Sequence, residues 1–194
     1  MIFVIDTSSA RSAVALIEAS GRVVREEEHP SGASFDLPAR FRELTAGAQL
    51  TKVVVATGPG SFTGLRVGVS FGLGLAMGLR IPIVPLRTLE LQAARSDEPV
   101  LAVAEAGRGR VYYRTPDGRQ ELGELSELPG GHDVVGWLKP STEQAMLAAG
   151  LRFRPESALK SFGEAAARQI ETASEVAYGS LKLEYMQSFS PRVF

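Results

Sequence analysis

The stretch from residue 53 to residue 79 constrains the fold more than any other part of this sequence. It opens with a β-branched run, Val53–Val55, which is typical of a buried strand. Gly58-Pro59-Gly60 predicts a tight turn, because glycine adopts backbone angles that other residues resist and proline fixes one dihedral. Ser61 or Thr63 is placed to cap a helix that continues to residue 79. We therefore expect a buried strand, a tight turn and a long apolar helix in succession.

Small residues recur at every fourth position of this helix, beside a row of large apolar residues. The small row is Gly64, Gly68, Gly72 and Ala76, and the large row is Leu65, Val69, Leu73 and Met77. Each glycine inside a helix lowers helix stability by about 1 kcal/mol relative to alanine, so the presence of several glycines here requires an explanation. One reason is close packing inside the protein, and the other is a partner or ligand on the bare row. A membrane span is a poor interpretation, because two arginines bound an apolar run shorter than the roughly 20 residues required.

Composition excludes several classes of site. The chain has 21 basic and 22 acidic residues, which argues against a protein that holds nucleic acid alone but not against a role in a complex that does so. It has no cysteine, which excludes disulfides and thiolate zinc sites, and only two histidines, His29 and His132, so we expect no metal site. The first residues read as a strand, not a signal peptide, so a cytoplasmic location is expected.

The first half of the chain predicts a small sheet with helices. Apolar runs at 2–5 and 13–17 and a strand from Val23 form a meander, and the acidic run 26–28 is interpreted as a solvated strand end. Ser34 or Asp36 opens an amphipathic helix, whose apolar face consists of Leu37, Phe41, Leu44 and Ala48. After the glycine-containing helix we expect a short strand at 81–85 and a helix from Thr88 to Arg95.

The second half repeats the opening pattern. An apolar strand at 100–104 ends in Glu105, a small polar turn and a second strand at 111–113, as the first strand ends in Asp6. The repeat predicts two related lobes, with a boundary at the polar segment 96–99 and hence domains at 1–96 and 97–194. We further expect a strand at 134–137, helices at 142–149 and 161–172, and a short strand or extended tail over 181–186.

Two turns offer candidate chemistry. Asp6, Thr7 and Ser8 follow a buried strand, where a carboxylate can orient hydrated Mg²⁺ and hydroxyls can hold phosphate; alternatively, Asp6 bonds its own backbone neighbours. The turn at 58–61 could bind an anion at a helix N-terminus, although it is not a P-loop. A peptidase would have to rely on Ser61 with His132, and no spacing supports that pair.

Three segments resemble the bacterial TsaB (YeaZ) family. They are Met1–Ser8, Gly58–Gly68, and Val100–Val103 with Gly109, Val111 and Tyr112. The resemblance implies the two-lobed fold of actin, Hsp70 and sugar kinases (the ASKHA fold), with an RNase-H-like unit in each lobe. It also implies work with a larger catalytic relative, TsaD, and an ATPase, TsaE, which together place threonylcarbamoyl on the adenosine next to the anticodon of certain tRNAs.

The resemblance implies a scaffold or activating subunit without catalytic residues or a cofactor of its own. ATP and magnesium are then expected in the partner proteins, and tRNA is reached only through the complex. The family's first two helices contact the catalytic relative, so the implied partner-binding residues are Leu37, Phe41, Leu44, Gly64, Arg66, Gly68 and Gly72. We expect the same exposed face to form a homodimer when the chain is alone.

The sequence departs from the family pattern at three places, which are Ala33-Ser34, Glu105–Arg108 and Leu183–Gln187. The second of these weakens the expectation of nucleotide binding, because an active relative needs an aspartate and open glycines at that turn. The alternative hypothesis is an independent small-molecule kinase or ATPase of the same fold.

Overall fold

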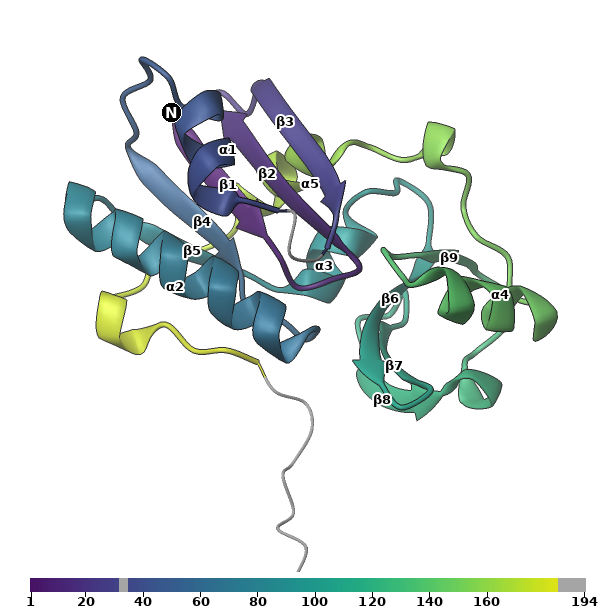
Figure 1. Cartoon of the computed structure of the whole chain (residues 1–194). Helices are drawn as coiled ribbons and strands as arrows, with labels where there is room; N and C mark the ends of the chain where they lie inside the picture. Colours follow the sequence, from purple (N-terminus) through teal and green to yellow (C-terminus); the bar gives the residue numbers. More distant parts are fainter. Residues whose placement is uncertain (32–34, 185–194) are drawn as a thin grey trace, which may run out of the picture.

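A computed structural model describes residues 1–31 and 35–184 of the chain, so Ala33, Ser34 and the predicted tail residues after Glu184 lie outside the described residues. Two sheets form the framework (Figure 1). The first sheet has the order β3-β2-β1-β4-β5. Its strands are β1 (Ile2–Asp6), β2 (Arg11–Ile17), β3 (Val23–Pro30), β4 (Lys52–Ala56) and β5 (Ile83–Leu86).

The second sheet has the order β8-β7-β6-β9. Its strands are β6 (Val100–Gly107), β7 (Arg110–Arg114), β8 (Gln120–Glu124) and β9 (Asp133–Val135). In both sheets the first strand pairs antiparallel with the next strand in the chain and parallel with the fourth. The predicted repeat is therefore confirmed at the level of topology. The sequence reading missed β8, whose residues show little apolar alternation.

Helices cover both faces of the first sheet. Figure 1 shows α1 and α2 on one face and α5 on the other. The helices are α1 (Leu37–Leu44), α2 (Phe62–Leu79), α3 (Thr88–Ala93), α4 (Pro140–Ala148) and α5 (Phe162–Ile170). Single 3-10 turns occur at η1 (Leu125–Glu127), η2 (Glu156–Ala158) and η3 (Tyr178–Ser180). Ser61 caps α2 as predicted, because its side chain accepts a hydrogen bond from the Gly64 N–H.

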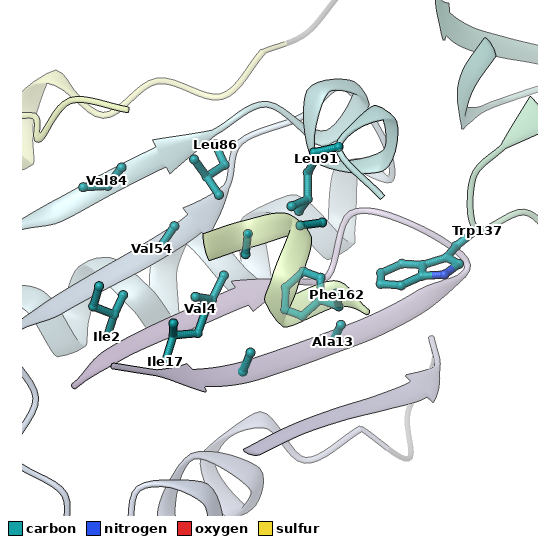
Figure 2. Packing of buried hydrophobic residues seen from close by; sticks show 14 residues of the cluster. Ile2, Val4, Ala13, Ile17, Val54, Val84, Leu86, Leu91, Trp137 and Phe162 are labelled. Atoms are coloured by element: carbon teal, nitrogen blue, oxygen red, sulfur yellow. The ribbon is translucent and has the colours of Figure 1, made fainter. Parts of the chain in front are cut away.

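Side-chain alternation along the central strands separates two cores. Phe3 and Ile5 point toward α1 and α2, whereas Ile2 and Val4 point toward α5. Figure 2 shows the second of these cores, where Phe162 of α5 packs beside Val4 and Ala13 and approaches Trp137. The sheet is therefore buried on both faces, as continuous apolar strands require.

The predicted division into 1–96 and 97–194 needs a correction at its end. The chain passes to the second sheet after α3, as expected, but α5 returns and packs on the first sheet. Its amphipathic face needs an apolar surface, which the alternate face of β1 and β2 supplies. The segment beyond α5 also lies on the first lobe, where the Glu184 N–H donates to the Thr57 carbonyl at 2.8 Å. The expected extended tail is thus confirmed as far as Glu184.

The acidic run at 26–28 is part of β3 and is not simply a solvated strand end. Its first carboxylate, Glu26 Oε2, accepts a hydrogen bond of 2.6 Å from the Gly163 N–H in the first turn of α5. A carboxylate at a helix N-terminus satisfies a free backbone donor and complements the helix dipole. Glu26 therefore attaches α5 to the edge of the sheet.

Candidate functional site

The turn after β1 is closed by the start of α2. Asp6 and Ser8 are fully buried, and Thr7 is 6% exposed. The Thr7 hydroxyl donates to the Gly64 carbonyl at 2.7 Å, and the Ser61 N–H donates to the Ser8 carbonyl at 2.7 Å. These contacts occupy the groups that a phosphate would need. The predicted phosphate-type turn at Asp6, Thr7 and Ser8 is therefore corrected to an internal joint between β1 and α2.

Asp6 makes the local turn that was the alternative interpretation. Its Oδ1 accepts from the Ser8 N–H at 2.8 Å and from the Ser8 hydroxyl at 2.6 Å. Its Oδ2 is buried and has no hydrogen-bond partner among the described residues. Burial raises the pKa of the Asp6 carboxyl, and the two bonds from Ser8 oppose that rise. The described residues contain no cluster of three or more acidic or histidine side chains that could hold a metal ion.

The row of small residues on α2 faces the protein's own first sheet. A Cβ at Gly64 would overlap the Thr7 carbonyl oxygen, and a Cβ at Gly68 would overlap the Thr7 hydroxyl. A Cβ at Gly72 would likewise overlap a methyl group of Val55. The prediction that Gly64, Gly68 and Gly72 contact a partner is therefore wrong. They permit close approach of α2 to β1 and β4, because no side chain separates the helix from the strands.

The predicted contact residues on α1 are also turned inward. Leu37 and Leu44 are 2% and 3% exposed, and both belong to the core between α1, α2 and the sheet. The Phe41 ring packs edge-on against Phe3 and Phe71, with centroid distances of 5.2 Å and 5.8 Å. The amphipathic pattern identified the apolar face of α1 correctly. That face binds this chain's own sheet rather than a partner.

The opposite face of α2 carries the exposed apolar surface. Val67 and Met77 are 51% and 53% exposed. The exposed residues that run along this face are Phe62, Thr63, Arg66, Val67, Ser70, Gly74, Met77 and Gly78, here called the outer α2 face. A Cβ at Gly74 or Gly78 would meet no atom within 4 Å, so packing inside the chain does not require a glycine at either position.

Arg66 is the one predicted contact residue that lies on the outer α2 face. Its guanidinium stacks on the Phe62 ring, 3.7 Å from the centroid. The helix also meets the length and hydropathy criteria of a membrane span, but it lies along β4, and its inner row packs on the sheet. We therefore interpret α2 as a half-covered surface helix of the first lobe.

A cleft of about 730 Å³ separates the two lobes. Its walls are the hairpin start Ser9–Arg11, the turn Gly60–Phe62, the second-lobe turn Glu105–Gly107, and Leu138–Pro140 at the start of α4. Glu105 does not point free into this space, because its Oε1 accepts from the Lys139 N–H at 2.9 Å. Glu105 thus corresponds in position to Asp6 but caps the segment that leads into α4.

The pair Ser61 and His132 receives no support from the geometry. The Ser61 hydroxyl accepts the Gly64 N–H as the cap of α2. His132 is exposed in the loop before β9, and no hydrogen bond joins it to Ser61 among residues 1–31 and 35–184. The nucleophile and base that a peptidase needs are therefore not assembled.

The sequence is similar to proteins of threonylcarbamoyladenosine formation on tRNA. Residues 42–135 match the family model described as TsaD, tRNA N6-adenosine threonylcarbamoyltransferase. The chain is 44% identical over 70 residues to the tRNA threonylcarbamoyladenosine biosynthesis protein TsaB of Bacillus subtilis, a match that covers 34% of this chain and 31% of the relative. It is 36% identical over 77 residues to TsaB of Escherichia coli, covering 36% and 33%.

The structural match extends over nearly the whole chain. YeaZ from Pseudomonas aeruginosa superposes with a TM-score of 0.70 at 19% identity and covers 95% of this chain and 99% of that one. The sequence matches and the shared fold together support the TsaB (YeaZ) family. The chain's two-lobed architecture is the ASKHA fold that the resemblance implied. The sequence matches to the TsaB relatives from Bacillus subtilis and Escherichia coli span only about a third of their length, so the activity of those proteins is not transferred by identity alone.

A second solved structure has the same fold over nearly the whole chain. It is described as an uncharacterized protein with similarity to peptidase YeaZ from Pseudomonas aeruginosa, and it superposes with a TM-score of 0.73 at 20% identity, covering 96% of this chain and 99% of that one. This likeness concerns the fold. In the present chain, Ser61 is the N-cap of α2.

Proposed function

We propose that this chain takes part in threonylcarbamoyladenosine formation on tRNA as a non-catalytic subunit. Its partner would be a larger TsaD-type catalytic relative, and a TsaE-type ATPase would supply nucleotide chemistry to the complex. The names of the TsaB relatives and the TsaD family match support this role. The formal net charge of −1 agrees with tRNA being reached through the complex instead of by this chain alone.

The outer α2 face is the observation that carries this proposal. Its glycines cost helix stability and touch nothing inside the chain, whereas its apolar residues remain exposed. A partner helix resting on Ser70, Gly74 and Gly78 could approach closely, with Val67 and Met77 packing at its sides. This surface replaces the inner glycine row and the α1 core residues as the proposed contact. Arg66 remains part of it.

The same face gives the proposed homodimer of the isolated chain. A two-fold axis can place the outer α2 face of one copy on that of another, because such an interface requires a single self-complementary patch. The larger relative would then compete with the second copy. Light scattering on the isolated chain should show a dimer, and addition of the relative should convert it to a heteromeric complex.

The decisive experiment measures binding to the TsaD-type relative from the same cell by calorimetry. Val67→Glu places a charge on the outer α2 face and should weaken binding by tenfold or more. Leu147→Glu is the matched control, since Leu147 is 56% exposed but lies on α4 of the second lobe. Equal affinities for the two variants would contradict the proposed surface. Absence of binding by the unchanged protein would contradict the proposed function itself.

The alternative of an independent kinase or ATPase makes the opposite prediction. A kinase or ATPase requires that the turn after β1 admit phosphate. The hydrogen bonds that join this turn to the start of α2 argue against phosphate binding there. We expect the purified chain to hydrolyse ATP at background rate. Turnover that disappears in Asp6→Asn would favour the alternative.

A further inference from the structure

A small cavity of about 150 Å³ lies between the two lobes, apart from the outer α2 face. Its polar walls come from distant parts of the chain. Arg11 begins β2, Arg95 follows α3, Trp137 follows β9, and Arg154 precedes η2. The fold therefore brings three guanidinium groups and one indole together in the wall of one cavity. No sequence motif predicts this cluster.

The arginines in the cavity wall are held in place by carboxylates. Arg11 pairs with Glu28 at 3.2 Å, and Arg154 pairs with Asp133 at 3.8 Å. Arg95 is 2% exposed and is held by the Glu156 carboxylate, by the Lys160 carbonyl at 3.3 Å, and by the Trp137 ring at 5.0 Å. A buried guanidinium fixed in this way cannot swing out to water. It is therefore a preorganised positive group in the wall.

Two N–H donors in the same wall have no acceptor. Trp137 Nε1 and Arg154 Nε are both buried, and neither has a hydrogen-bond partner among the residues that the structure describes. Both groups can only donate, so they cannot satisfy each other. Leaving a buried donor unpaired is costly. Figure 2 shows the indole nitrogen on the edge of Trp137 that points away from Phe162, out of the apolar core.

We propose that this cavity binds one phosphate-sized oxyanion. Such an anion would accept hydrogen bonds from the indole N–H of Trp137 and from the Nε–H of Arg154, the two buried donors that have no acceptor among the described residues. Guanidinium groups suit phosphate and similar oxyanions because their planar forks donate in parallel. The cavity is several times larger than the roughly 30 Å³ share of one water molecule, so it has room for the anion. The site is independent of the proposed partner surface.

The single tryptophan of the chain makes the site directly observable. Inorganic phosphate is titrated into the ¹⁵N-labelled protein at constant ionic strength, with chloride as the replaced salt. The Trp137 indole signal should shift and saturate. Sulfate should act in the same way, and acetate should act more weakly if the site selects a tetrahedral anion. An indole signal that does not respond to any of these anions would overturn the proposal.

Matched arginine variants localise the effect. Arg154 and Arg152 both pair with Asp133, at 3.8 Å and 3.5 Å, but only Arg154 lines the cavity. Arg154→Met should weaken phosphate binding at least fivefold, whereas Arg152→Met should leave it unchanged. Equal weakening in both variants would show general surface attraction and refute the site.

Trp137→Phe provides a second arm, read by thermal melting with and without phosphate. It removes the unpaired donor and keeps an aromatic ring in the core. The rise in melting temperature caused by phosphate should shrink in this variant. An unchanged rise would show that the anion binds elsewhere, and the proposal would fail.

Discussion

Gly68 of α2 lies directly against Thr7 at the end of β1, so that a Cβ on the glycine would overlap the threonine hydroxyl. That hydroxyl also donates to the Gly64 carbonyl one turn earlier. The contact closes the turn after β1 and fixes which side of α2 faces the sheet. As a consequence, the other side of the helix is left for a partner.

Gly68→Ala should lower the free energy of unfolding by about 1–3 kcal/mol, because the added methyl group overpacks the joint with Thr7. Gly74→Ala is the matched control on the same helix and should raise it by up to about 1 kcal/mol, since nothing lies within 4 Å of its Cβ position. Urea denaturation of both variants measures the difference. Stabilisation by both substitutions would contradict the inward orientation of Gly68.

Arg80→Gly should stabilise the isolated chain by about 1 kcal/mol. Arg80 ends α2 in the left-handed conformation, at φ 56° and ψ 44°, which glycine adopts without steric cost. Arg42→Gly, in the regular helix α1, should instead destabilise by about 0.5–1 kcal/mol. Chemical denaturation at equal buffer conditions tests both signs. A loss of stability in Arg80→Gly would mean that the arginine side chain makes an important contact.

Asp6→Asn should change how stability depends on pH. The folded state raises the pKa of Asp6 above its ordinary value of 3.8, so the native protein holds this proton more tightly than the unfolded chain does. The Asp6 contribution therefore falls as pH rises above 3.8 until the folded-state pKa is passed. The variant lacks this decline, which denaturation midpoints measured from about pH 4 to about pH 7 would reveal.

Asp97→Asn serves as the control of opposite sign. Lys160 and Arg168 hold the pKa of Asp97 below its ordinary value, so its contribution is lost as pH falls through the acidic range. The two variants should thus flatten opposite trends. Identical pH profiles for both would contradict the burial of Asp6.

Glu26→Ala should cost about 1.5–3 kcal/mol, because it removes a charge-assisted hydrogen bond to the Gly163 N–H at the start of α5. Glu28→Ala removes the neighbouring surface pair with Arg11 and should cost less than about 1 kcal/mol. Hydrogen exchange in α5 should accelerate in the first variant only. Equal exchange in both would show that α5 is held by its apolar face alone.

The sequence by itself determined the elements and their repeat. Periodicity and turn chemistry are local, so the strand, turn and capped helix from Val53 to Leu79 could be predicted, as could the matching turns at Asp6 and Glu105. The same local rules missed β8, which gains its place from pairing with β7. They also placed α5 in the wrong lobe, because an amphipathic pattern states that a face is buried and not against which surface.

Only the tertiary structure decided the orientation of α2. The sequence pattern places Gly68 and Gly74 in the same helix but does not tell which of them faces the sheet. In the structure, a Cβ at Gly68 would overlap Thr7, whereas a Cβ at Gly74 would meet no atom within 4 Å. The cavity between the lobes could not be predicted from the sequence either. Its lining residues Arg95, Trp137 and Arg154 come together only when the two lobes pack against each other. Contacts between residues far apart in the chain depend on how whole helices and strands pack together, and no single segment of the sequence determines that packing.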